Sequence, residues 1–304
     1  MSDVASGTAV FKDKFIAFVD ILGFKNMVTE AEAGRGMPLQ DIIAATKDLG
    51  SRADREDMRE RGPRLCPGSP KLAPDIDFQI TQISDCAVVS TEMSPAGALG
   101  VVNHCWQACL ALLSKGLMCR GFITRGRIYH TEDQFIGSGY HAALDGEKAV
   151  SIFRLQPDEL TTPFIEVDPV VVQYVNELGD PCVRKMFDRF TQSSDGLTAV
   201  FPFKRLNQSF MINDDFNADR ELESLNNIRD WIREMKGKLA AGTTRADPSA
   251  VLKAAQYNRM LDSQLVACDK TELRIEEWRD VMNRARSRSA SDPRRGSPTK
   301  FDKS

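Results

Sequence analysis

The 304-residue chain has little of the chemistry that many metalloproteins and secreted proteins use. It contains three histidines, His104, His130 and His141, so a histidine-rich metal site is not expected. Its seven cysteines are odd in number and lie mostly in apolar segments, which indicates buried, reduced thiols rather than a disulfide framework. A metal bound by this chain would instead take oxygen ligands, which Mg²⁺ and Mn²⁺ prefer.

Long apolar runs and a large net charge are missing as well. We identify no run that approaches the roughly 20 residues of a membrane span, and the N-terminal residues lack the basic and apolar regions of a signal peptide. The formal net charge of −3 gives no bulk attraction to nucleic acid. With 42% hydrophobic and 27% charged residues, the composition is that of an ordinary globular chain. We therefore expect a cytoplasmic protein that binds neither membrane nor nucleic acid.

Two aspartates lie where apolar strands are expected to end. Residues 15–19 are β-branched and aromatic, as in a buried strand, and Asp20 follows them, with Gly23 in the next turn. Asp85 lies at the expected turn of a hairpin over residues 78–90. Two strand-end carboxylates in apolar surroundings are suited to two-metal phosphoryl chemistry. Taken singly, each aspartate is more simply interpreted as a helix cap or a turn residue.

The rest of the chain is expected to alternate strands and helices before it becomes wholly helical. Periodicity predicts strands near 118–129, 134–139, 164–167 and 197–203, and helices near 26–32, 39–49, 96–115, 141–153, 169–178, 219–239, 247–268 and 272–285. Residues 51–74, rich in charge, Gly and Pro, are expected to form a mobile insertion. We divide the chain into a catalytic domain (1–215), a helical segment (216–285) and a disordered Ser/Arg-rich tail (286–304).

Four stretches within residues 14–150 follow one another in a recognisable order. They are Asp20-Ile21-Leu22-Gly23-Phe24, Ile83-Ser84-Asp85, Arg120-Gly121-Phe122-Ile123-Thr124-Arg125-Gly126 and Gly137-Ser138-Gly139-Tyr140-His141-Ala142-Ala143. This order resembles the class III nucleotide cyclases. The resemblance implies an α/β fold of the α+β sandwich type, with a palm-like central, mostly antiparallel sheet flanked by helices and, here, a helical C-terminal extension. It also implies a homodimer whose active sites are each completed by the partner chain.

The resemblance implies a role for each matching residue. Asp20 and Asp85, with the backbone carbonyl of Ile21, would hold two divalent ions, Mn²⁺ or Mg²⁺. The backbone N–H groups of Leu22-Gly23-Phe24 would bind the β- and γ-phosphates, and the forked guanidinium of Arg120 would pair with phosphate oxygens. The ribose 3′-hydroxyl would attack the α-phosphorus and release diphosphate. Asp20, Asp85 and Arg120 are thus the expected catalytic residues.

Two departures from the family pattern concern the nucleobase. Gln79 and Gln134 stand where purine cyclases have a base-reading Lys and Asp. An amide both donates and accepts hydrogen bonds, so this pair cannot copy the purine pattern. Gln79 and Gln134 are therefore the expected base contacts of a cyclase that does not use purines.

A further departure concerns the helix that serves the ribose and the transition state. His141 and Asp145 stand where the family has an Asn and an Arg. Asp145 adds negative charge beside a triphosphate, where charge has to be neutralised. Either another cation replaces the Arg or activity is lost. The candidates for this replacement are Arg125, Arg127 and Lys148.

Together these departures resemble the bacterial pyrimidine cyclases of Pycsar antiphage systems, whose cyclic UMP or cyclic CMP activates a cell-killing effector. The expected reaction converts UTP to 3′,5′-cyclic UMP and diphosphate, because uridylate cyclases are the commoner type. Nothing in the residues separates uracil from cytosine, so CTP is an alternative substrate. An adenylate or guanylate cyclase is a rival interpretation, and so is a catalytically inactive, nucleotide-binding homologue.

Overall fold

The strand-forming segments assemble into a single sheet with the order β2-β3-β1-β4-β6-β8-β7, and β5 pairs with β4. The computed structural model describes residues 9–50, 54–56, 58, 76–206, 216–243 and 247–290. The strands are β1 (Lys12–Ile21), β2 (Gln79–Ile83), β3 (Cys86–Glu92), β4 (Cys119–His130), β5 (Phe135–Ile136), β6 (Ile165–Val167), β7 (Thr191–Ser194) and β8 (Leu197–Val200). Paired strands are antiparallel apart from β4 and β6, which are parallel. A mostly antiparallel sheet is what we expected.

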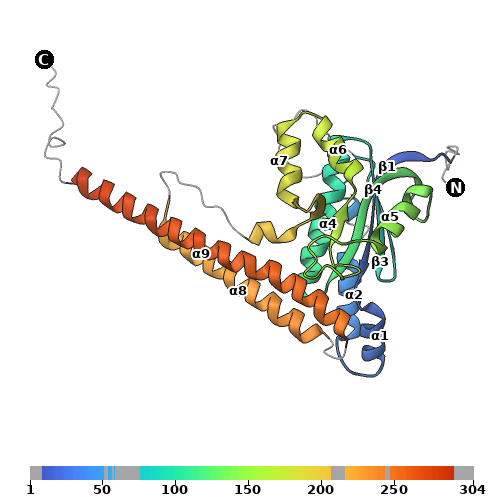
Figure 1. Ribbon diagram of the computed structural model, residues 1–304, viewed down its shortest axis with the longest axis horizontal. Coiled ribbons are helices and arrows are strands. Elements are labelled where there is room, and N and C mark those ends of the chain that lie inside the picture. The colour runs from blue at the N-terminus through green and yellow to red at the C-terminus, as the bar shows by residue number, and fades with distance from the viewer. Residues whose placement is uncertain are drawn as a thin grey trace, which may run out of the picture.

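Helices cover the sheet and then extend away from it (Figure 1). They are α1 (Phe24–Glu32), α2 (Leu39–Asp48), α4 (Pro95–Ser114), α5 (Ser138–Lys148), α6 (Pro169–Glu177), α7 (Pro181–Phe190), the 3₁₀ helix η1 (Pro202–Leu206), α8 (Ala218–Gly242) and α9 (Pro248–Ala290). The mixed α/β class and the flanking helices are therefore confirmed.

The alternation of side chains along β1 gives the sheet two buried faces. Phe15 and Ala17 point into the main core, which α4 covers, whereas Ile16 and Phe18 point to the opposite face, where they meet Ala143 of α5. Asp20 follows Phe18 by two positions in the strand, so its side chain points to the same face as Phe18, the one that α5 covers. The fold thus places the candidate site on the face of the sheet that α5 only partly covers.

Helix α4 is the exception to our expectation that the chain has no membrane-length apolar run. By length and composition alone, Pro95–Ser114 could cross a membrane, but most of it is buried within the protein. Its N-terminus is capped by Ser94, whose hydroxyl accepts from the Gly97 N–H at 2.9 Å. One helix of this kind is weak evidence for a membrane span, because a buried core helix can have the same length and composition.

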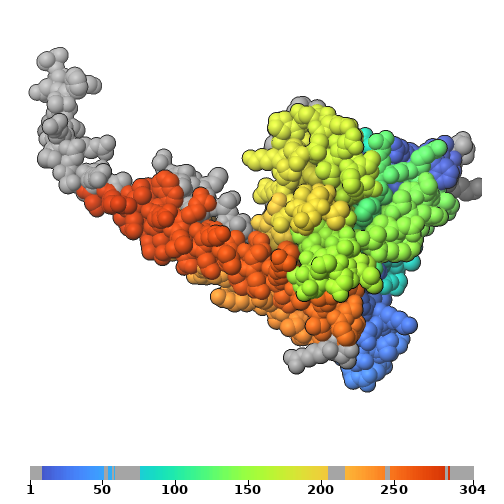
Figure 2. All heavy atoms as spheres, viewed as in Figure 1, coloured from blue at the N-terminus to red at the C-terminus, as the bar shows by residue number. Residues whose placement is uncertain are grey.

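Helices α8 and α9 form an antiparallel hairpin whose far end projects from the body (Figures 1 and 2). Arg229 of α8 pairs with Asp269 and Glu272 of α9. The sequence predicted a break near residue 270, but α9 is continuous, since neither Gly nor Pro interrupts it there. It also continues to Ala290, so residues 286–290 are helical rather than part of a disordered tail.

Other expected elements differ in extent. The strand over 134–139 is reduced to β5, because Gly137 leads directly into α5. The strand expected at 197–203 ends at Val200, and Pro202 and Phe203 belong to η1 instead. Helix α7 and strand β7 were not predicted. Of the insertion expected at 51–74, only residues 54–56 and 58 lie within the described part of the chain, and they are helical.

Candidate functional site

Three separate segments bring Asp20, Asp85 and Arg120 to one end of the sheet. Asp20 is opposite Arg120 of β4 on one side and Cys86 of β3 on the other. Asp85 lies in the tight turn between β2 and β3, and its backbone carbonyl accepts a hydrogen bond from the Ile21 N–H at 2.9 Å. The three expected catalytic residues are therefore neighbours in space, as the sequence predicted.

Asp20 is an electrostatically unfavourable carboxylate. Burial raises its pKa to about 7, helped by the negative charges of Asp85 and Glu147 and by a hydrogen bond with the Asp85 side chain, and opposed by Arg120. Burial, with the charges of Asp20 and Asp85, raises the pKa of the Cys86 thiol to about 11, so Cys86 stays a neutral thiol. An added cation would favour the ionised form of Asp20.

Arg120 is held in place by two residues that the sequence did not single out as site residues. Its Nε donates to Glu147 of α5, and its Nη1 donates to Thr161 Oγ1 at 3.1 Å. The Glu147 side chain is only 6% exposed, so this ion pair is buried. Glu147 follows buried Ala143 by one helical turn, and that spacing was the signal for its inward direction.

Glycines bring α5 close enough to β4 for Glu147 to reach Arg120. A Cβ added to Gly126 of β4 would lie 2.6 Å from the Gly139 Cα, and one added to Gly146 would lie 2.3 Å from a Phe122 ring atom. Neither gap admits a methyl group. These two glycines therefore set the separation of helix and strand on which the Arg120–Glu147 pair depends.

The turn after β1 supplies fewer phosphate donors than expected. The Leu22 N–H already donates to the Met118 carbonyl at 2.9 Å, so its expected role as a phosphate donor is wrong. Gly23 has φ 76°, a left-handed conformation that favours glycine, and begins α1 without a side-chain cap. The expected donors that remain at this end are the N–H groups of Gly23 and Phe24, where α1 begins.

The expected base contacts lie elsewhere. Gln79 is level with Ser90 and Ile16 in the sheet, four positions from Asp20, which is roughly 13 Å along the strands. Gln134 is exposed just before β5. Within one chain, the structure does not bring this pair into contact with the two aspartates.

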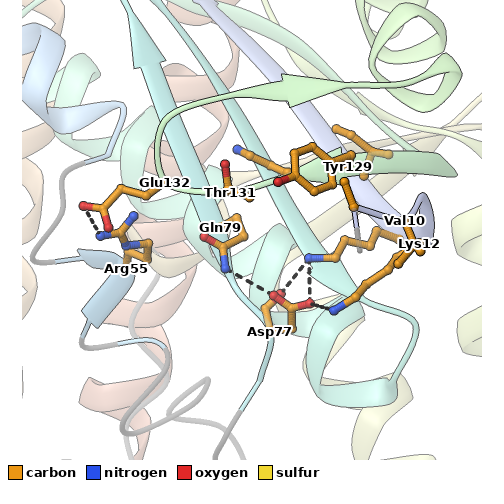
Figure 3. A pocket seen from close by; sticks show the side chains of 12 residues that line it. Val10, Lys12, Arg55, Asp77, Gln79, Tyr129, Thr131 and Glu132 are labelled. Carbon is orange, nitrogen blue, oxygen red and sulfur yellow. Dashed lines mark hydrogen bonds and ion pairs between the residues drawn. The ribbon is translucent and has the colours of Figure 1, made fainter. Parts of the chain in front are cut away.

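Gln79 instead lines a cavity of about 360 Å³ on the same face of the sheet (Figure 3). Its amide Nε2 donates to Asp77 Oδ1 at 3.3 Å, and the Lys12 ammonium also approaches Asp77 (Figure 3). Lys14 is 2% exposed and pairs with Asp77 at 2.9 Å. Burial alone would raise the pKa of Asp77, but the hydrogen bonds and charge of Lys14, with Lys12, hold it at about 2.

His130 lines the same cavity as a neutral imidazole. Burial lowers its pKa to about 4, and the positive charge of Lys14 contributes. One ring nitrogen lies 2.8 Å from Ser90 Oγ and the other 3.0 Å from Thr81 Oγ1. Because both nitrogens have hydroxyl partners, the ring is fixed without a charge.

The three cations suggested as replacements for the family's Arg have other partners. Arg125 pairs with Asp13, Lys148 pairs with Asp145, and Arg127 lies 5.9 Å from the centre of the Phe11 ring. The charges that act most strongly on the pKa of Asp20 are those of Asp85, Glu147 and Arg120. The suggestion that one of these three serves the Asp20 site therefore gains no support.

The oxygen donors at this end of the sheet suit a hard divalent ion that takes its remaining ligands from substrate phosphates and water. In the described ranges, no group of three or more His, Cys, Asp or Glu side chains could hold a metal by itself. Asp20 and Asp85 supply two carboxylates, and Mg²⁺ commonly binds through one or two carboxylates plus substrate phosphates and water. The raised pKa of Asp20 is consistent with such an ion.

The chain matches no protein-family model, and no curated protein is significantly similar to it in sequence. A functional proposal must therefore come from the residues and their geometry.

Proposed function

We propose that this protein is a nucleotide cyclase of the class III type, with the palm-like fold of that family, which converts UTP to 3′,5′-cyclic UMP and diphosphate. The observation that carries the proposal is the meeting of Asp20 and Asp85 at a strand end beside Arg120. Phosphoryl transfer to an internal hydroxyl depends mainly on positioning and on neutralising charge. Arg120, together with divalent ions held by the two carboxylates, would provide both the positioning and the positive charge.

Asp20 and Asp85, with the carbonyl of Ile21, would hold Mn²⁺ or Mg²⁺, which when bound would activate the ribose 3′-hydroxyl and neutralise the diphosphate. The remaining contacts to the phosphates would come from the protein itself. Arg120, oriented by Glu147 and Thr161, would pair with phosphate oxygens. The first N–H groups of α1 would donate to the phosphates.

The Asp77–Gln79 contact supports a base with a hydrogen-bond donor on its edge. Asp77 is ionised and only accepts, so the Gln79 NH₂ faces it, and the Gln79 carbonyl oxygen is left to accept from the base. Uracil offers N3–H and cytosine its amino group, and adenine and guanine also carry donors, so this contact alone does not choose the base. Since Gln79 and Asp20 are apart within one chain, we propose a homodimer in which one protomer contributes base contacts to its partner's site.

A cytoplasmic enzyme of this kind would act through its product, which would activate a downstream effector in antiphage defence. The test is incubation of the purified protein with each ribonucleoside triphosphate and Mn²⁺, with products separated by mass. Asp20→Ala and Asp85→Ala should abolish turnover, and Asp195→Asn, at the exposed turn between β7 and β8, should not.

Each outcome is informative. A cyclic pyrimidine supports the proposal and names the base. A cyclic purine retains the mechanism but overturns the interpretation of Gln79 and Gln134. If no triphosphate is converted, while one binds through Asp20 and Asp85, the protein is a nucleotide-binding homologue without catalysis.

A further inference from the structure

The first turns of α9 pack on the loop that positions Arg120. This loop joins α5 to β6 and contains Thr161, the partner of Arg120 Nη1. Gln256 of α9 donates to Glu159 in the loop, and the Tyr257 ring stacks on Phe164 with centroids 5.3 Å apart and planes at 13°. In Figure 1, this end of α9 lies at the same end of the molecule as α1, which follows Asp20.

Lys253 lies on the face of α9 that meets this loop. Gln256 and Tyr257 follow it by three and four positions, so all three side chains project from one side of the helix. Gln256 and Tyr257 are fully buried, and Lys253 is half-buried. Lys253 is close enough to Arg120 and Glu147 to feel both charges. A residue of the C-terminal hairpin thus reaches the charged cluster around the candidate site.

Two carboxylates, Glu147 and Asp247, act on Lys253, and each of them has another partner. Among the described residues Lys253 forms no ion pair within 4 Å. Glu147, the buried carboxylate nearby, is already bonded to Arg120. Asp247 is exposed at the start of α9, where its carboxylate accepts the Ser249 N–H at 2.9 Å. Burial lowers the pKa of Lys253, and the like charge of Arg120 lowers it further, so a nearby anion would favour its charged form.

The position of this extra positive charge indicates which anion it would bind. The charge of Arg120 influences the pKa of both Asp20 and Lys253, so the guanidinium lies near both the carboxylate pair and the ammonium. A polyphosphate chain bound through a divalent ion at the aspartates would extend over Arg120 toward Lys253. A lysine acts on phosphate as a compact point charge on a flexible stem.

We propose that Lys253 binds the terminal phosphate of the triphosphate substrate together with Arg120, and that the α8–α9 hairpin is therefore part of the active site. The identity of the ligand rests on the proposed function. The contact itself depends on the chain's own geometry and is tested with inorganic tripolyphosphate, which has no base or ribose.

The experiment is calorimetric titration of the full chain with tripolyphosphate in the presence of Mg²⁺. Lys253→Gln should weaken binding about 10- to 100-fold, the usual effect of losing one hydrogen bond to a charged group. Lys253→Arg should stay within a few-fold of the wild type, because it retains the charge. The matched control is Lys270→Gln, an exposed lysine on the same helix, which should bind as the wild type does.

The results separate this inference from the proposed function. Lys253-dependent tripolyphosphate binding without turnover of any nucleotide would support the phosphate contact and overturn the cyclase. Turnover of UTP with unchanged KM and unchanged tripolyphosphate affinity in Lys253→Gln would support the cyclase and overturn the contact. Wild-type protein that binds no tripolyphosphate overturns the contact directly. If Lys253→Gln does not fold, Lys253→Met, which retains the apolar stem, is compared with Lys253→Arg.

Discussion

Replacing Asp20 by Asn is expected to stabilise the metal-free protein at alkaline pH. Burial and the charges of Asp85 and Glu147 raise the pKa of Asp20 to about 7, which means that the fold disfavours its ionised form. Asn has almost the same shape and no charge. For a fully buried group, a shift of this size corresponds to roughly 4 kcal/mol. Since Asp20 is only half-buried, solvent screening reduces the expected gain in the free energy of unfolding to about 1–2 kcal/mol.

The gain has a defined pH dependence. Below the unfolded-state pKa of 3.8, Asp20 is protonated in both states, and wild type and variant should be equally stable. Between 3.8 and about 7, the folded wild type keeps a proton that the unfolded chain has released, so its stability falls as the pH rises. Above about 7 the full difference is present. Urea unfolding in EDTA, followed by circular dichroism across this range, measures it.

Two control variants test whether the change in stability is specific to Asp20. Asp195→Asn should change nothing, because that side chain lies at an exposed turn whose left-handed conformation Asn tolerates. Asp77→Asn should have the opposite sign at neutral pH, because it leaves buried Lys14 without its closest carboxylate, whose pKa is held at about 2. Mn²⁺ should stabilise the wild type more than Asp20→Asn. An Asp20→Asn protein no more stable than wild type at pH above about 7, or a gain independent of pH, would refute the reasoning.

Three further predictions concern stability and packing. As the pH falls from 6.5 to about 4, the wild type should lose stability, because His130 binds a proton in the unfolded chain but not in the folded one, and His130→Gln should reduce this loss. Urea midpoints measured against pH test this, and an unchanged slope would contradict it. Gly126→Ala should lower stability by about 2 kcal/mol or more, since the new methyl meets the Gly139 backbone. Gly237→Ala, exposed in α8 with open space around it, should instead raise stability by about 0.5–1 kcal/mol in thermal unfolding, because Ala favours the helix. Tyr257→Ala should cost about 3–5 kcal/mol by removing a buried ring from Phe164, and limited proteolysis should then cleave α9 sooner; unchanged protection would contradict the docking described above.

Local pattern was sufficient to predict the part of the fold that carries the aspartates. An apolar run ending in Asp20 and a hairpin turning at Asp85 are short-range signals, and pairing of their strands brings both residues together. The break predicted near residue 270 is wrong: Asp269 and Thr271 are residue types that favour helix caps, but neither Gly nor Pro occurs there, and α9 continues through them. β7, Thr191–Ser194, is polar at most positions, and only its pairing with β8 makes it a strand.

The site residues that sequence reasoning missed depend on long-range contacts. The spacing of Glu147 from Ala143 indicates its inward direction, but only the packing of α5 on β4 shows that Glu147 meets Arg120. Lys253 belongs to a helix that the sequence analysis assigned to a separate segment with no stated role. The Leu22 N–H was expected to be a donor for phosphate, but the carbonyl of Met118, from a distant segment, occupies it. A motif predicts which residue types meet, whereas which groups are already bonded depends on the tertiary structure.

The charges around Asp20 favour a ligand that carries both signs. A divalent ion alone would relieve the repulsion between Asp20 and Asp85 but would add no anion to Glu147 and Asp247, which already act on Lys253. A free phosphate would meet Arg120 and Lys253 but would leave the carboxylates repelling each other. A triphosphate with its divalent ion satisfies both groups at once. The two key variants should therefore differ: Asp20→Asn should gain stability and lose the stabilisation by Mn²⁺, whereas Lys253→Gln should keep that stabilisation and lose affinity for tripolyphosphate. If both variants lost only phosphate affinity, the carboxylates would not be a metal site, and the two-metal mechanism would fail.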